Sequence, residues 1–125
     1  MSEPAHPFLS IIFSFRNEEH VLPELLRRVR AVMVDATTKG LLNTHELIFV
    51  NDASVDRSLE ILLEAAKGHQ DIKIINMSRN FGVSPCVMAG LAHAKGDVVV
   101  YNKDLQLVKA YNSQELAELQ NQMSK

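Results

Sequence analysis

The sequence lacks a second cysteine and any long apolar run. Because Cys86 stands alone, no disulfide bond can form within the chain, which suits a reducing compartment. No segment approaches the roughly 18 apolar residues that a membrane-spanning helix needs. The first residues, Met1 to Pro4, lack the basic and then apolar order of a signal peptide. These absences predict a cytoplasmic protein.

An excess of positive charge is also missing, since 13 Lys and Arg residues oppose 15 Asp and Glu residues for a net charge of −2. With no basic stripe interleaved with aromatic residues, we expect no nucleic-acid partner. The phosphate-binding patterns G-x-G-x-x-G and G-x-x-x-x-G-K-[ST] do not occur. The five histidines show no metal-ligand spacing. A dinucleotide-binding domain, a P-loop enzyme and a histidine metal site are therefore disfavoured.

The composition is that of a globular protein, with 46% hydrophobic residues in a chain of 125, which is enough for one domain. Apolar runs typical of buried strands alternate with the apolar spacing typical of helices. We expect strands at Phe8 to Phe15, Leu47 to Val50, Ile72 to Met77 and Val98 to Tyr101. A helix should follow each of the first three strands, and these helices should end near Gly40, Gly68 and Gly96. We expect Ser84 to be the N-cap of the third helix and a polar helix to begin at Asn112. The alternation predicts an α/β domain, a Rossmann-like parallel sheet with helices on both faces.

Polar segments follow every predicted strand, at the carboxyl ends where such sheets bind their ligands. These segments are Arg16 to Glu19, Asn51 to Asp56, Ser78 to Gly82 and Asn102 to Gln106. Ser54 and Asp56 lie just ahead of the second helix, where capping is the simpler role. Asp52 and Asp104 lie at strand ends, where a ligand would lie.

Asp104 and Gln106 are the pair best suited to chemistry. Residues two apart in an extended chain point the same way, and a carboxylate with an amide oxygen can bind Mg²⁺ or Mn²⁺, which neutralises a diphosphate. With Asp52 accepting a hydrogen bond from a base or ribose, the residues indicate a metal-assisted nucleotide-phosphate site. Asp52 also fits a phospho-acceptor signalling domain of flavodoxin-like topology, although the acidic residues needed beside it are not at the expected strand.

The order of these segments resembles family 2 glycosyltransferases with the GT-A fold. Phe13 to Glu19 and Ile48 to Asp56 resemble the opening motifs of that family. One branch of this family transfers a sugar from a nucleotide diphosphate sugar to a polyprenyl phosphate, as dolichyl-phosphate mannose synthases and bactoprenol glucosyltransferases do. Four further segments resemble that branch: Ser78 to Gly82, Ala89 to Leu91, Gly96-Asp97, and Asp104 to Gln106. The match covers residues 8 to 106. It implies the N-terminal half of a GT-A fold, with its strands in the order 3-2-1-4.

The resemblance also implies roles for single residues. Asn17 and Glu18 would border the nucleotide base, Asp52 would hydrogen-bond it, and Arg79 and Asn80 would approach the ribose or diphosphate. Asp104 and Gln106, together with Asn102, would bind Mg²⁺ or Mn²⁺. A uridine nucleotide is expected first and a guanosine nucleotide second. Relatives in this branch act at the cytoplasmic face of a membrane.

The sequence departs from the family at several of these positions. Ser14 replaces a proline, Asn51 an aspartate and Ala53 a glycine. Asn102 takes the place of the first aspartate of the metal motif and Lys103 follows it. The site therefore loses a negative charge and gains a nearby positive one, so a weak metal site is expected.

The resemblance stops after Gln106. Residues 1–106 match the nucleotide-sugar-binding half, and residues 107–125 form a divergent tail that we expect to be helical. The acceptor-binding half has no counterpart, so we assign no catalytic residue and expect the chain alone not to turn over. Transfer would need a partner chain that supplies the acceptor half, and self-association of this chain is a separate expected interaction. The alternative is a truncated, inactive module that binds a nucleotide or another protein.

Overall fold

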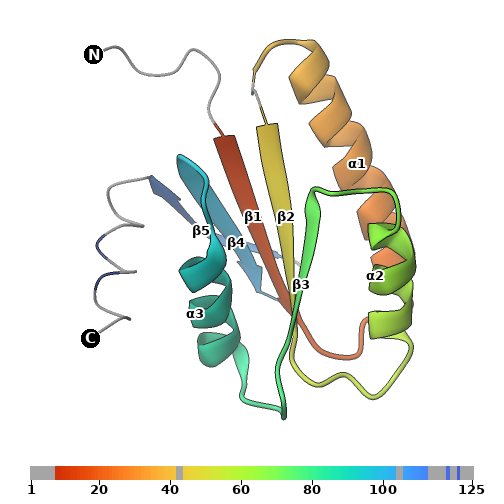
Figure 1. Cartoon of the computed structure of the whole chain (residues 1–125). Helices are drawn as coiled ribbons and strands as arrows, with labels where there is room; N and C mark the ends of the chain where they lie inside the picture. The colour runs from red at the N-terminus through yellow and green to blue at the C-terminus, as the bar shows by residue number, and fades with distance from the viewer. Residues whose placement is uncertain (1–7, 42–43, 104–105, 113–117, 119–120, 122–125) are drawn as a thin grey trace.

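The computed structural model describes residues 8–41, 44–103 and 106–112, together with Glu118 and Asn121. Four parallel strands form most of one sheet (Figure 1): β1 Phe8–Phe15, β2 Thr44–Asn51, β3 Ile72–Asn76 and β4 Val98–Lys103. The strands lie in the order β3-β2-β1-β4, which confirms the sequence prediction. The antiparallel strand β5, Gln106–Asn112, lies outside β4.

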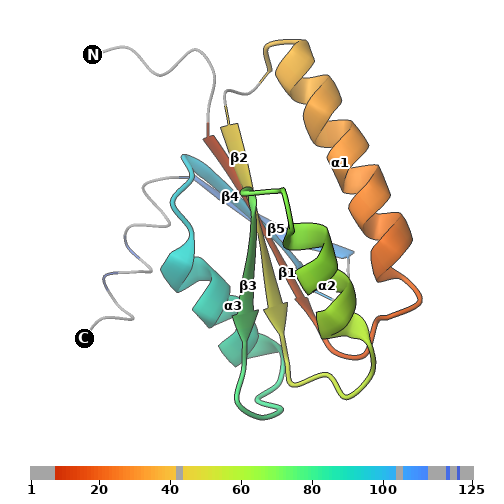
Figure 2. The ribbon, with the colours of Figure 1, turned by 45° about the vertical axis from the view of Figure 1, so that its right-hand side comes forward.

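Helices cover both faces of this sheet, as predicted. Figures 1 and 2 show α1 and α2 on one side and α3 on the other. Their bounds are α1 Leu22–Thr38, α2 Ser58–Ala66 and α3 Val83–His93. Gly40 and Gly68, beyond the ends of α1 and α2, have φ of 73° and 78°, the left-handed conformation typical after a helix.

Strand residues alternate between two buried clusters because successive side chains point to opposite faces. Ile12 and Ile48 pack with α3, while Phe13 and Phe49 pack with α1 and α2. The Phe13 and Phe49 rings stack with centroids 4.8 Å apart. Helix α3 lies so close to β1 that a Cβ on Gly90 would come within 2.5 Å of the Ile12 side chain. The sheet is thus buried on both faces, which explains the continuous apolar runs of its strands.

A buried polar cluster near the amino ends of the strands joins the turn after α3 to the sheet. The Glu46 carboxylate accepts hydrogen bonds from the Ser10 hydroxyl at 2.6 Å and the Lys95 backbone N–H at 2.7 Å, and it pairs with Lys73. The Ser10 oxygen in turn accepts the Gly96 N–H at 2.8 Å. Burial acts to raise the pKa of Glu46, but the bonds from Lys73, Ser10 and Lys95 outweigh it and lower that pKa.

Two predictions of secondary structure need correction. Helix α3 begins at Val83, with Gly82 and not Ser84 as its N-cap. Residues 107–112 of the tail belong to strand β5, so a helical tail is wrong for them. This segment contains the strand formers Leu107, Val108 and Tyr111, and pairing with β4 satisfies backbone groups that an edge strand would expose.

Beyond β5, Glu118 and Asn121 are helical, and the remaining predicted helical residues lie outside the described part of the chain. No helix in the described part has both the length and the apolar character needed to cross a membrane.

Candidate functional site

The carboxyl ends of β1, β2 and β3 align along one edge of the sheet. Phe15 lies beside Asn51, and Asn51 lies beside Asn76. The loops that follow these strands therefore meet at this edge, which is the lower one in Figure 1. We call these loops, residues 16–21, 52–57 and 77–82, the rim. The ends of parallel strands are where open α/β sheets bind ligands.

Side chains of the β2 loop hold the backbone of the β1 loop. Three consecutive backbone N–H groups of the β1 loop each donate to a side-chain oxygen that follows β2. The bonds run from Asn17 to Ser54 at 2.9 Å, from Glu18 to Ser58 at 2.9 Å, and from Glu19 to Asp56 at 3.1 Å. Asn17 returns the contact, because its side-chain oxygen accepts the Val55 N–H at 2.8 Å. The two loops are thus one hydrogen-bonded unit.

These bonds revise the predicted capping roles. Ser54 caps no helix, since its hydroxyl oxygen accepts the Asn17 N–H. Asp56 bonds locally to the Ser58 N–H at 2.9 Å and also accepts the Glu19 N–H. Burial acts to raise the pKa of Asp56, but its hydrogen bonds with Ser58 and Glu19 dominate and lower that pKa. Sequence reasoning missed this cross-loop role, although the spacing Ser54, Asp56, Ser58 carries oxygen acceptors at every second residue.

Asp52 joins the β2 end to the β3 loop. The residue is 6% exposed, and its carboxylate accepts the backbone N–H groups of Phe81 at 2.8 Å and Gly82 at 3.0 Å. The Cys86 thiol is buried nearby, and burial together with the Asp52 carboxylate raises the pKa of Cys86 to about 12. Cys86 is therefore a protonated packing residue, as expected for a buried thiol that is not a nucleophile.

The Asn51 side chain links the β2 loop to the end of β3. Its side-chain oxygen accepts the Ser54 N–H at 3.0 Å, and its amide group donates to the Asn76 side chain at 3.1 Å. An aspartate at this position could not donate to Asn76. The family departure from aspartate to Asn51 is thus matched by a partner at the end of β3.

The rim contains three arginines, Arg16, Arg57 and Arg79. Of the six arginines, Arg27, Arg28, Arg30 and Arg57 form ion pairs with carboxylates, and within the described residues Arg16 and Arg79 form none. The Arg79 guanidinium lies 4.4 Å from the centroid of the Phe81 ring, an arrangement that favours a cation. Guanidinium donors without a carboxylate partner suit a phosphate group.

The structure brings together the predicted nucleotide residues of three loops. Asn17 and Glu18 follow β1, Asp52 follows β2, and Arg79 and Asn80 follow β3. Arg79, Asn80 and Asn17 are exposed, Glu18 is half-buried, and Asp52 is buried. The rim therefore presents groups from every predicted segment except the metal motif.

The predicted metal ligands lie partly outside the described residues. Asp104 is outside them, so its role as a metal ligand stays a prediction. Asn102 lies near the end of β4, and Gln106 begins β5, which returns antiparallel to β4 with Gln106 beside Lys103. The chain thus changes direction between Lys103 and Gln106. No group of three or more His, Cys, Asp or Glu residues could hold a metal ion in the part of the chain that the structure describes.

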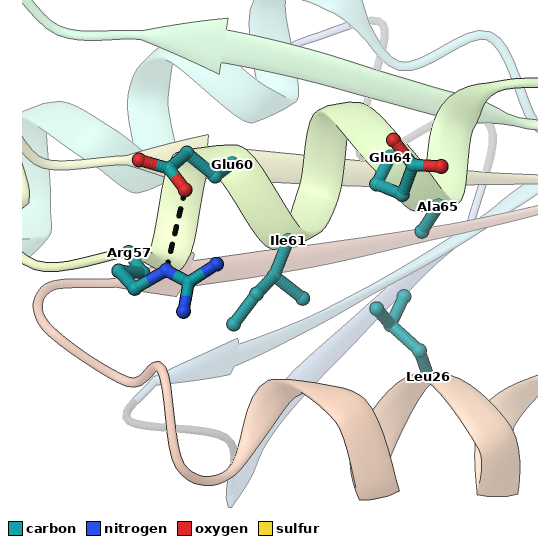
Figure 3. A pocket seen from close by; sticks show the side chains of 6 residues that line it. All are labelled: Leu26, Arg57, Glu60, Ile61, Glu64 and Ala65. Carbon is teal, nitrogen blue, oxygen red and sulfur yellow. Dashed lines mark hydrogen bonds and ion pairs between the residues drawn. The ribbon is translucent and has the colours of Figure 1, made fainter.

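A hollow of about 470 Å³ lies between α1 and α2 (Figure 3), and Arg57 of the rim is among the residues that line it. Its lining residues are Leu26, Arg57, Glu60, Ile61, Glu64 and Ala65. The charged groups there pair with neighbours on the same helix, Arg57 with Glu60 at 3.2 Å and Glu64 with Lys67 at 2.9 Å. With its charges already paired, this hollow is a weaker candidate than the rim.

Comparison with known proteins supplies the family. The model of the family "Glycosyl transferase family 2" matches residues 10–115. The glycosyltransferase YkcC of Bacillus subtilis is 43% identical over 102 residues. An undecaprenyl-phosphate 4-deoxy-4-formamido-L-arabinose transferase of Pseudomonas savastanoi is 40% identical over 101 residues, and a dolichyl-phosphate beta-glucosyltransferase of Trichomonas vaginalis is 32% identical over 98. The matches cover 78–81% of this chain but only 28–30% of those relatives.

Solved structures agree in fold. The mannosyltransferase PcManGT from Pyrobaculum calidifontis, in complex with GDP-Man and Mn²⁺, has a TM-score of 0.62 at 21% identity. The match covers 80% of this chain and 28% of that one. TarS of S. aureus in complex with UDP-GlcNAc has a TM-score of 0.59 at 23% identity, over 78% of this chain and 26% of that one. The fold is that of part of a GT-A glycosyltransferase.

Proposed function

This chain belongs to glycosyl transferase family 2, and we propose that it forms the nucleotide-sugar-binding part of an enzyme that transfers a sugar to a polyprenyl phosphate. The rim carries this proposal. Three loops, hydrogen-bonded to one another, present Arg16 and Arg79 without carboxylate partners in the described structure. Relatives named for undecaprenyl-phosphate and dolichyl-phosphate transfer support the choice of acceptor.

In the proposed complex the nucleotide lies across the rim. Asn17 and Glu18 border the base, and Arg79 and Asn80 face the ribose and diphosphate, with Asp52 beneath them. During transfer an oxygen of the acceptor phosphate attacks the anomeric carbon, and the bond from that carbon to the nucleoside diphosphate breaks. Negative charge then builds on the leaving diphosphate, where a guanidinium stabilises it.

Three residues would hold a divalent cation, namely Asn102, Asp104 and Gln106. Their oxygen donors are of the kind that Mg²⁺ and Mn²⁺ bind, and Asn102 and Gln106 lie on neighbouring strands. A bound cation would neutralise charge on the diphosphate. Because Asp104 is the one carboxylate of the set and Lys103 is adjacent, we expect weak binding.

A uridine diphosphate sugar is the proposed donor, with a guanosine diphosphate sugar second. The solved structures with UDP-GlcNAc and with GDP-Man are consistent with either base.

Calorimetry with UDP and GDP tests the proposal on the 125-residue polypeptide. We expect one of them to bind, and Arg79→Gln to weaken the affinity by about tenfold, since a hydrogen bond to a charged group contributes roughly 1.5–3 kcal/mol. Arg27→Gln is the matched control, because Arg27 pairs with Glu24 on α1 and should leave the affinity unchanged. Binding of neither nucleotide would refute the proposal.

A second candidate is a module that binds the nucleotide without turnover. Asn102 in place of an aspartate favours it. For these 125 residues taken alone we expect no transfer. An assay with a nucleotide sugar and a polyprenyl phosphate in detergent separates the candidates, because sugar on the lipid would exclude the inactive module.

A further inference from the structure

Asp52 lies beneath the rim and has its hydrogen-bonding groups engaged inside the protein. Its two carboxylate oxygens accept the N–H groups of Phe81 and Gly82, at 2.8 Å and 3.0 Å. The Cys86 thiol, which is 0% exposed, lies near this carboxylate, and burial together with the carboxylate raises the pKa of the thiol. Asp52 itself is 6% exposed. Little of this side chain is left to contact a ligand that arrives from solvent.

The two N–H groups belong to the segment that carries Arg79. The Phe81 ring lies 4.4 Å from the Arg79 guanidinium and supports it. Gly82 follows with φ of 93°, a conformation that strains most other residues, and α3 begins at the next residue. The Asp52 carboxylate therefore fixes the ring on which the guanidinium rests and the turn that leads into α3.

We propose that Asp52 is a positioning residue, which acts on the nucleotide diphosphate by holding the Phe81 support of Arg79. The proposal rests on the proposed function, because it takes Arg79 to bind the diphosphate. It differs from the direct contact with the base that the family resemblance implies. If the carboxylate is lost, the Phe81 and Gly82 amides lose their acceptor, the guanidinium loses its fixed position, and the cost falls on binding of phosphate and not of the base.

The test compares UDP with inorganic pyrophosphate, which has no base. Binding of both to the 125-residue polypeptide is measured by NMR titration for the unmodified chain, Asp52→Asn, Arg79→Gln and the double variant. We expect Asp52→Asn to weaken UDP and pyrophosphate alike, by about tenfold. In the Arg79→Gln background the same substitution should cost little more, since residues that act through one another show non-additive effects.

Asp71→Asn is the matched control. Asp71 is also a partly buried carboxylate with two partners, Arg30 and His45, but it lies at the amino end of β3. We expect it to lower stability and leave both affinities unchanged. If Asp52→Asn does not fold, as circular dichroism would show, Asp52→Ser replaces it, because serine can still accept one N–H.

Two results would overturn the proposal. One is a loss of UDP affinity in Asp52→Asn with pyrophosphate affinity unchanged, which would place Asp52 on the base. The other is a double variant in which the two losses multiply. If the unmodified chain binds neither UDP, GDP nor pyrophosphate, the proposed function fails, and the role of Asp52 fails with it.

Discussion

Ala53 and Asn17 share a backbone conformation that few residues adopt. Their φ angles are 56° and 55°. Asparagine tolerates this left-handed region, and Asn17 gains a hydrogen bond to Val55 there. Alanine gains nothing comparable and has a Cβ that crowds the following carbonyl. The left-handed backbone conformation at position 53 therefore explains why the family carries glycine there.

Ala53→Gly should therefore stabilise the protein. The left-handed conformation costs a non-glycine residue about 1–2 kcal/mol, and the extra freedom of glycine in the unfolded chain offsets part of this gain. We expect the free energy of unfolding in urea to rise by about 0.5–1 kcal/mol. Ala31→Gly, inside α1, is the control and should lower it by a similar amount. A destabilised Ala53→Gly would mean that the strain at this turn is absent.

Glu46 gives stability a definite pH dependence. Its side chain is 3% exposed, and its hydrogen bonds lower its pKa in the folded state from the usual 4.5. A carboxyl group whose pKa is lower in the folded than in the unfolded protein stabilises the fold at pH values above its unfolded-state pKa. This stabilisation is lost as the pH falls through the folded-state pKa. The window is therefore the acidic range below about 4.5.

Glu46→Gln tests this dependence by denaturation across that range. We expect lower stability at neutral pH and a shallower fall with acid, because glutamine does not titrate and cannot pair with Lys73. The slope should not vanish, since the pKa values of Asp56 and Asp71 are lowered too. Glu60→Gln, on the surface of α2, should leave the slope unchanged. An unaltered slope in Glu46→Gln would show that this carboxylate is not the titrating group.

At the scale of elements, the segment from Asn51 to Ser58 connects the loops of β1 and β3. Its side chains accept or donate six hydrogen bonds to those loops and to the end of β3, and Ser58 begins α2 while accepting the Glu18 N–H. A change in one loop should therefore affect the others. These bonds restrict the conformations of the rim, and such restriction lowers the entropy cost of binding a ligand.

Ser58→Ala should disturb this unit measurably. Ser58 is 0% exposed, and its loss leaves the Glu18 N–H without its acceptor. We expect a loss of about 1–3 kcal/mol in the free energy of unfolding, together with faster hydrogen exchange at Glu18. Ser78→Ala, at an exposed serine of the rim, is the matched control and should change stability little. Equal stability of the two variants would contradict the linkage of the loops.

The elements could be predicted from the sequence because their signals are local. The apolar runs of β1 to β4 and the spacing in α1 identify strands buried on both faces and a helix with one buried face. Strand β5 was not predictable in the same way, since its pairing with β4 depends on contacts between chain segments. The start of α3 was misjudged because the bond from Gly82 to Asp52 spans 30 residues.

The rim shows the same division. The parallel order of the strands brings the polar residues at the strand ends together. It was therefore predictable that Asn17, Asp52 and Arg79 lie near one another. The role of each side chain was not predictable, because Ser54, Asp52 and Asn51 form hydrogen bonds with backbone or side-chain groups of other segments. Residue type predicts hydrogen-bonding capacity but not the partner.

At the scale of the whole molecule, two substitutions should strengthen the proposed metal site. Asn102→Asp combined with Lys103→Ala adds one negative charge and removes one positive charge beside Asp104 and Gln106. We expect Mn²⁺ affinity to rise by about tenfold or more, since cation affinity follows the charge of the ligands, without restoring transfer. Proton relaxation of water measures the bound Mn²⁺, and Lys67→Ala on α2 controls for net charge. Unchanged affinity would mean that Asp104 and Gln106 are not ligands.

The most direct test of the account is where a nucleotide binds. Titration of the ¹⁵N-labelled polypeptide with UDP, and then GDP, reports each backbone amide. We expect the shifts to concentrate in the rim, residues 16–21, 52–57 and 77–82, and to spare the residues of α1 and α2 that line the hollow between these helices. Shifts centred on Leu26, Ile61 and Ala65 in that hollow, or no shifts with either nucleotide, would contradict it.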